Sequence, residues 1–219
     1  NENLDPIMND TEKQIFSLLQ NRTAAEYMPI SEIVITALDR IEQAANNKSS
    51  VTGISTGFTD LDLKTSGLQP ADLVLLAARP SMGKTAFVLN IAQYIASHQK
   101  LGTVVFSLEM SKEQLVNRLL SVESRVDAQM IRNGTLKEAE WLRLVEAAGV
   151  IGDSGLIIDD TPGISISELR SKCRKYSLEH GLKLIIIDYL QLMSGSGKNE
   201  SRQQEISDIS RSLKGIARE

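Results

Sequence analysis

The chain has 219 residues, of which 42% are hydrophobic and 24% are charged, a composition typical of a globular protein. It carries 24 Lys and Arg against 28 Asp and Glu, for a net charge of −4, so any contact with nucleic acid must rest on a local basic patch. The single cysteine, Cys173, excludes an internal disulfide and favours a reducing compartment. There is no apolar run of the roughly 18 residues that a membrane span needs, and no secretory signal pattern at the first residues. We therefore expect a soluble, cytoplasmic protein with no membrane partner.

Residues 1–50 are predicted to form a helical linker ahead of the main domain. A capping box at Thr11 and Gln14, followed by apolar residues on one face, predicts a helix over about 10–21. A second apolar stripe predicts a helix over about 31–46, and a polar run ends the linker. A helix as short as the first needs a surface to lie on, which belongs either to the same chain or to a neighbouring subunit.

From residue 51 to 219 short apolar strands alternate with helices. The patterns predict strands at 73–77, 103–108, 156–159 and 184–188, and helices at about 84–97, 111 onward, 136–148, 166–180 and 204–219. Capping boxes beginning at Ser111, Thr135 and Ser165 mark three of the helix starts. Strands that are apolar on both faces and alternate with helices indicate a parallel sheet covered on both sides. The predicted fold class is α/β, with a core that looks incomplete at its C-terminus.

A phosphate-binding loop is predicted between the first of these strands and its helix. The run from Ala78 to Thr85 matches the pattern Gly-x-x-x-x-Gly-Lys-Ser/Thr, except that Ala78 stands at the first glycine. Gly83 allows the backbone to approach an anion closely, and Lys84 supplies a positive charge for the outer phosphates. Thr85 offers a hydroxyl to magnesium. The loop therefore predicts nucleotide binding, with ATP and Mg²⁺ as the cofactors.

Two carboxylates follow predicted strands and are candidate catalytic groups. Asp188 ends the last strand, where it would face the ligand crevice and hold magnesium, although such an aspartate can also cap a turn. Glu109 follows the strand at 103–108 and could polarise the attacking water if that strand lies beside the phosphate-loop strand. Its alternative role is a favourable interaction with the dipole of the next helix. Asp159 and Asp160 also end a strand, but the Thr-Pro-Gly that follows is typical of a turn.

Three basic side chains are further candidates for binding. Arg118 lies in the helix after Glu109, where it could reach a phosphate or an interface acid, or remain a solvated arginine. Lys198 and Arg202 lie in a loop at 194–202, rich in Gly and Ser, that follows Asp188, and they could contact DNA phosphates. The alternative is a solvated loop. With few aromatic residues outside apolar settings, the sequence offers no stacking platform for bases, so backbone contacts are expected.

Taken together, these motifs resemble the bacterial DnaB-type replicative DNA helicases of the RecA-like superfamily. The resemblance covers about residues 51–219 and rests on the runs Gly53–Asp62, Gly67–Pro70, Ala77–Ala86, Phe106–Ser111, Ile158–Gly163 and Ile187–Leu192. Ala78 is usual in the loop of this family. Ser55 and Ala71 depart from a common Pro and a common Gly, and neither touches the chemistry.

The resemblance implies a RecA-like P-loop ATPase domain in a homo-hexamer that hydrolyses ATP at subunit interfaces and moves 5′ to 3′ along single-stranded DNA. It implies that Lys84 and Thr85 bind phosphate and magnesium, that Asp188 is the Walker B acid, and that Glu109 is the catalytic carboxylate. The remaining nucleotide-binding positions that it implies are Ser81, Met82, Gly83, Ala86 and Arg118.

The resemblance also implies parts and partners beyond these residues. The helix at 10–21 corresponds to a linker helix that docks on the adjacent subunit, and primase and a helicase loader are the expected protein partners. In the family, an arginine finger that completes the next subunit's site follows the region matched here. Such a finger contributes about 10³ to 10⁵ in rate, so we expect these residues alone to bind ATP but to hydrolyse it poorly.

Two other functions stay open on the sequence. One is a RecA relative of the recombinase or clock type, whose ring acts on DNA or protein without unwinding. The other is a non-catalytic assembly module in which nucleotide only stabilises the ring. The linker helix at 10–21 and the Asp-Asp-Thr-Pro-Gly run favour the helicase. The presence of both Glu109 and Asp188 argues against the non-catalytic module, which could dispense with either.

Overall fold

The computed structural model describes residues 29–46, 51–79, 81–193 and 202–219. The chain divides into two units, Asn1–Ser49 and Ser50–Glu219, and each is described by itself. The helix predicted at 10–21 and the loop position Lys198 lie outside the described residues.

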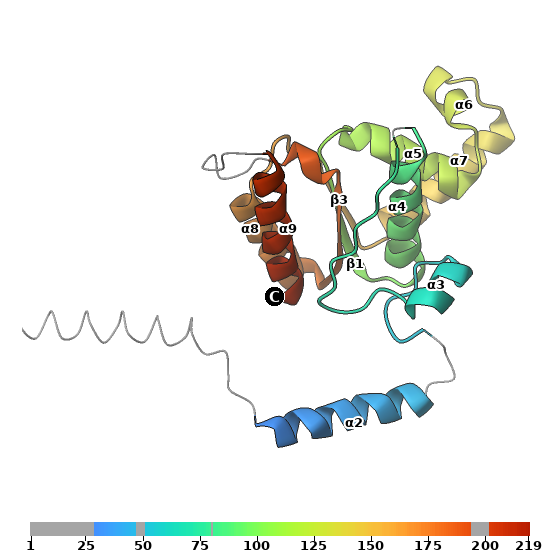
Figure 1. Cartoon of the computed structure of the whole chain (residues 1–219). Coiled ribbons are helices and arrows are strands. Elements are labelled where there is room, and N and C mark those ends of the chain that lie inside the picture. The colour runs from blue at the N-terminus through green and yellow to red at the C-terminus, as the bar shows by residue number, and fades with distance from the viewer. Residues whose placement is uncertain (1–28, 47–50, 80, 194–201) are drawn as a thin grey trace, which may run out of the picture. The chain divides into compact units, whose positions relative to one another are not determined.

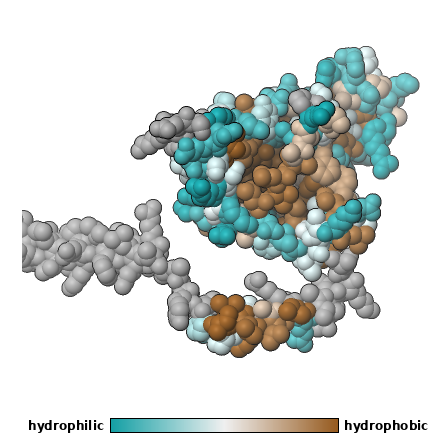
Figure 2. Space-filling view, in the orientation of Figure 1, coloured by the Kyte–Doolittle hydropathy of each residue, from teal (hydrophilic) through white to brown (hydrophobic). Residues whose placement is uncertain are grey.

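In the first unit, helix α2 (Ile30–Asn46) confirms the helix predicted at 31–46. Its apolar side chains recur at the helical spacing, and those of Ile30, Val34, Leu38 and Ile41 are exposed. Figure 2 shows brown, hydrophobic areas along this helix. An apolar stripe of this kind is typical of a helix that packs on another surface.

The second unit holds a parallel sheet of three strands in the order β2–β1–β3, with helices around it (Figure 1). The strands are β1 (Gly102–Ser107), β2 (Leu156–Asp159) and β3 (Leu182–Asp188). The helices are α3 (Thr59–Thr65), α4 (Lys84–Gln93) with its π-helical continuation η1 (Tyr94–His98), α5 (Lys112–Ser124), α6 (Ala128–Asn133), α7 (Glu138–Gly152), α8 (Ile166–His180), the 3-10 turn η2 (Leu190–Leu192) and α9 (Arg202–Arg218). None of the described helices is long and apolar enough to cross a membrane.

The central strand β1 separates two apolar cores. Val104 and Phe106 point to one face, where they pack with residues of α8 and α9, including Leu169 and Leu213. Val105 points to the other face, where it packs with residues of α4 and α5. This alternation follows from the two-residue period of a strand. It confirms the predicted α/β arrangement of a parallel sheet covered on both sides.

Three of the predicted strands are present with shifts of at most two residues at an end, and the predicted strand at 73–77 is absent. In this segment Val74, Leu75 and Leu76 are 66%, 70% and 44% exposed, while Leu73 packs against the core beside α8 and α9. In the second unit, Figure 2 shows a brown area along the path that the segment before α4 follows in Figure 1. Of the residues in this apolar run, only Leu73 is partly buried. The run forms no strand, because a strand also needs a neighbouring backbone to pair with.

Within the described ranges, helix starts follow the predicted capping boxes in two cases out of three. Ser111 caps α5 in a reciprocal box with Gln114, and the Ser165 hydroxyl accepts from the Glu168 N–H of α8. The box predicted at Thr135 is wrong, because the Thr135 N–H donates to Met130 and so closes the end of α6. Helix α7 begins three residues later, with Lys137 as its cap residue and the Glu140 carboxylate accepting from the Lys137 N–H.

The two aspartates at the end of β2 hold neighbouring elements together. The Asp159 carboxylate is buried and accepts from Thr161, from the Tyr176 hydroxyl at 3.1 Å and from the Lys172 ammonium at 2.9 Å. Burial alone would raise its pKa, but these hydrogen bonds outweigh burial and lower the pKa of Asp159 below its ordinary value. Asp160 accepts from the Lys112 N–H at the start of α5. The turn chemistry expected for this pair is confirmed.

We predict that Ser111→Ala lowers the free energy of unfolding by about 1 kcal/mol, since it removes a formed helix cap. Thr135→Ala is the matched control, because this exposed residue caps no helix, and it should change stability by less than about 0.5 kcal/mol. Urea unfolding followed by circular dichroism measures both. Equal losses for the two variants would contradict the assignment of the caps.

We predict that the Asp159 contacts stabilise the fold at neutral pH and fail in acid. Because the folded-state pKa of Asp159 lies below its ordinary value, the contribution is complete above about pH 4 and is lost as the pH falls through the lower folded value. Urea midpoints between pH 7 and pH 3 should therefore fall less steeply for Asp159→Asn than for the unaltered chain. Parallel curves for the two proteins would show that the Asp159 carboxylate does not carry this dependence.

Candidate nucleotide-binding site

The predicted phosphate loop leads directly into the first turn of α4. Ser81 and Gly83 lie at φ values of 63° and 84°, in the left-handed region that glycine adopts with little strain. The Met82 N–H donates to the Arg79 carbonyl at 3.3 Å, which tightens the turn, and Met82 itself is exposed. Lys84 is the first residue of α4. The open backbone N–H groups at such a helix start favour an anion.

Asp188, the last residue of β3, joins this loop to the sheet. One of its carboxylate oxygens, Oδ2, accepts from the Thr85 hydroxyl at 2.6 Å. The other, Oδ1, lies 3.4 Å from the Lys84 ammonium. The Asp188 side chain is 6% exposed and that of Lys84 is 29% exposed, so the carboxylate is buried while the lysine stays partly open to solvent. The structure therefore brings together the three predicted residues Lys84, Thr85 and Asp188.

Tyr189 also contacts this site, although the sequence patterns predict no role for it. The Lys84 ammonium lies 4.4 Å from the centre of its ring, close enough for a cation–π interaction. The lysine is thus held between a carboxylate and an aromatic face. Tyr189 immediately follows Asp188 in the sequence, and this position is the signal that could have identified it.

Glu109 comes to the same edge of the sheet through strand pairing. Strand β1 pairs in parallel with β3, with Ser107 opposite Asp188. The Leu108 N–H continues the ladder by donating to the Asp188 carbonyl at 2.8 Å. Glu109 follows in the next position and is exposed. The strand at 103–108 therefore neighbours the strand that ends in Asp188.

The remaining predicted site residues are less closely tied to this centre. Ala86 lies in the first turn of α4, and Arg118 is exposed on α5, where no described residue pairs with it. Arg202 begins α9 and its guanidinium contacts the Gln191 carbonyl and the Glu205 carboxylate. The roles assigned to Arg118, Lys198 and Arg202 stay predictions.

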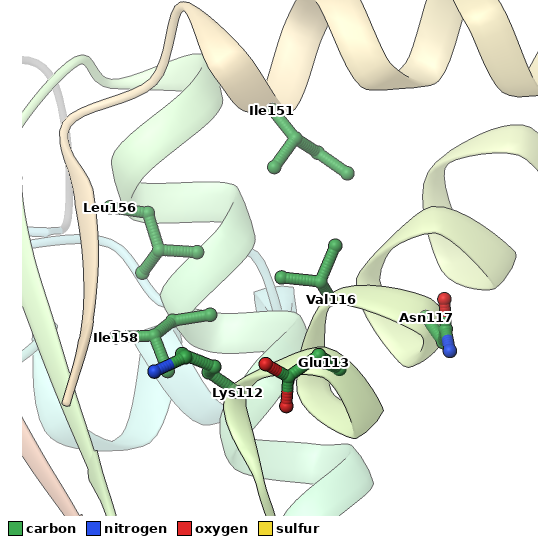
Figure 3. A pocket seen from close by; sticks show the side chains of 7 residues that line it. All are labelled: Lys112, Glu113, Val116, Asn117, Ile151, Leu156 and Ile158. Carbon is green, nitrogen blue, oxygen red and sulfur yellow. The ribbon is translucent and has the colours of Figure 1, made fainter. Parts of the chain in front are cut away.

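A separate pocket of about 490 Å³ lies between α5, α7 and β2 (Figure 3). Apolar side chains from all three elements point into it, with Lys112 and Glu113 at α5. Its apolar lining consists of Val116, Ile151, Leu156 and Ile158. None of the predicted site residues lines this pocket.

Residues 53–219 match the family model described as the DnaB-like helicase C-terminal domain. The chain belongs to this family. It is 48% identical to the replicative DNA helicase DnaC of Bacillus subtilis and 46% identical to the replicative DNA helicase DnaB of Geobacillus stearothermophilus. Both alignments take in 100% of this chain and 48% of the relative, so the chain spans about half the length of these relatives.

Two solved structures share the fold of this chain. One is an isolated ATPase domain, with a TM-score of 0.81 and 37% identity, over 88% of this chain and 68% of that one. The other, a DnaB-like replicative helicase studied for its interactions with primase, has a TM-score of 0.77 and 34% identity, over 94% and 50%. These similarities confirm the predicted RecA-like fold class and the predicted resemblance to DnaB-type helicases.

Proposed function

We propose that the chain is the ATP-hydrolysing part of a replicative DNA helicase that works as a homo-hexamer in the cytoplasm. In this proposal the ring moves 5′ to 3′ along single-stranded DNA, hydrolyses ATP at subunit interfaces, and meets primase and a helicase loader. Membership of the DnaB-like family supports the activity. The observation that carries the proposal is the convergence of Lys84, Thr85 and Asp188 at the start of α4.

The residues at this centre fit a nucleotide with magnesium. A hydroxyl and a carboxylate oxygen lie side by side, and oxygen atoms are the ligands that Mg²⁺ prefers. Thr85 and Asp188 would hold the ion, which neutralises charge on the phosphates when it is bound. Lys84 would bind the outer phosphates beside the N-terminus of α4. In this scheme Glu109 orients and polarises the attacking water from the end of β1.

The hexamer has support in unpartnered apolar surface. Among the areas of this kind that the described residues offer are the stripe along α2 and the pocket between α5, α7 and β2. Contacts between identical subunits bury surfaces of this kind. We propose that both face other copies of this chain, while the predicted docking helix at 10–21 remains a proposal of its own.

We predict that Lys84→Ala and Glu109→Gln each lower ATP turnover in the native protein by about 10² to 10³-fold, the loss typical of removing one group placed to meet developing charge. Lys183→Ala, at the opposite end of β3 from the site, is the charge-matched control and should keep full turnover. A coupled ATPase assay with and without single-stranded DNA, followed by an unwinding assay on forked DNA, makes the measurement.

DNA-stimulated turnover with unwinding is the expected result. Turnover that DNA does not change would contradict the helicase function and would support a RecA relative that acts on a protein. Full turnover in Glu109→Gln would remove Glu109 from the mechanism. Nucleotide binding without turnover in the native protein would leave the non-catalytic assembly module as the remaining function.

We predict that Leu38→Asp, on the apolar stripe of α2, shifts the native protein from hexamers to smaller species, since a charge would have to be buried at the subunit contact. Thr36→Asp adds the same charge away from this stripe and should leave the hexamer intact. Sedimentation velocity compares the two variants. Hexamers in both would show that α2 takes no part in assembly.

A further inference from the structure

Glu109 lies in a short turn that the protein holds from several sides. The turn starts where β1 ends, and the Leu108 N–H donates to the Asp188 carbonyl on β3. It finishes where Ser111 caps α5, and the next backbone N–H, that of Lys112, donates to the Asp160 carboxylate. The side chain of Glu109 is exposed in this turn. The backbone that carries this carboxylate is therefore anchored on both sides.

Ser107 closes the turn from within. Its side chain is buried, with 2% of the residue exposed. The Ser107 hydroxyl donates to the Met110 carbonyl at 2.7 Å and accepts from the Met110 N–H at 3.3 Å. One hydroxyl thus holds both polar groups of the residue after Glu109. Without it, neither of these two Met110 contacts could form.

The position of Ser107 in the sheet connects this turn to the phosphate site. Ser107 is the strand partner of Asp188, whose carboxylate binds Lys84 and Thr85. The turn that carries Glu109 is therefore built on the residue opposite the centre of the phosphate site. Any change in the turn moves Glu109 relative to a phosphate that this centre would hold.

We propose that Ser107 is a positioning residue for ATP hydrolysis, which acts by fixing the backbone on either side of Glu109. This inference rests on the proposed function, and within it on the role of Glu109. Both hydrogen bonds of the hydroxyl go to the Met110 backbone. It sets where the Glu109 carboxylate lies, and a displacement of about 1 Å at such a group can cost about 10²-fold in rate.

The chain supplies a matched control in Ser124. This residue is 5% exposed, and its hydroxyl also makes two backbone contacts, donating to the Leu120 carbonyl at 2.6 Å and accepting from the Val126 N–H at 3.2 Å. It lies at the other end of α5 from Glu109. Ser107→Ala and Ser124→Ala therefore remove the same kind of buried hydroxyl, one beside the site and one away from it.

The test is ATP turnover by the native protein and by these two variants. Ser107→Ala should lower kcat about 10- to 100-fold with the KM for ATP nearly unchanged, whereas Ser124→Ala should keep kcat. Thermal unfolding should shift comparably in both. Equal kcat values for Ser107→Ala and the native protein would overturn the inference, as would equal losses in the two variants. If Ser107→Ala does not fold, Ser107→Cys, whose thiol bonds more weakly, is measured by the same criteria.

A double variant separates positioning from a general loss of structure. In the Glu109→Gln background there is no carboxylate to position, so adding Ser107→Ala should lower the residual turnover by less than about twofold. A full further loss would show that Ser107 acts independently of Glu109 and would overturn the inference. Full activity of Glu109→Gln alone would instead defeat the proposed role of Glu109, so the two failures are distinguishable.

Discussion

The candidate site depends on the parallel ladder between β1 and β3 at their carboxyl ends. The Leu108 N–H bonds to the Asp188 carbonyl, and Ser107 lies opposite Asp188. Because all three strands run in the same direction, their last residues meet at one edge of the sheet. The loop at the start of α4 reaches the same edge through Thr85 and Lys84. Residues from distant parts of the chain thus share one location.

Asp188 is the electrostatic centre of this edge. A buried carboxylate is costly unless its oxygens are bonded, and each of its two oxygens has a partner, the Thr85 hydroxyl or the Lys84 ammonium. In the proposed function, these same partners engage the nucleotide and its magnesium. The contacts that stabilise the carboxylate in the fold therefore also keep the binding groups together.

The end of β2, which lies on the other side of β1 from β3, has a structural role. Asp159 and Asp160 fasten β2 to α8 and α5 through Lys172, Tyr176 and the first N–H of α5. Three strands thus end in polar residues at one edge, and their roles differ with their partners. The cation that pairs with Asp159 at the end of β2 is Lys172 of α8. The cation that pairs with Asp188 at the end of β3 is Lys84 of the phosphate loop.

Local patterns in the sequence predicted much of this correctly. The strands at 156–159 and 184–188, the caps at Ser111 and Ser165, and the helix start at Lys84 depend on neighbouring residues, so a short window contains the information. Local reasoning failed at Thr135, whose N–H belongs to the end of the preceding helix. It also missed α3 and α6, which are too short to show a clear period.

The sequence by itself determined the α/β class, the phosphate loop and the acids at the strand ends, because each is written in adjacent residues. The patterns favoured Asp188 for the site, and only the tertiary structure brought this acid into contact with the loop. It pairs Asp188 with Lys84 and Thr85, directs Asp159 to Lys172, and leaves the apolar run at 73–77 outside the ladder. The physical reason is that strand order and register arise from contacts between distant segments, and the apolar character of a strand does not specify its partner.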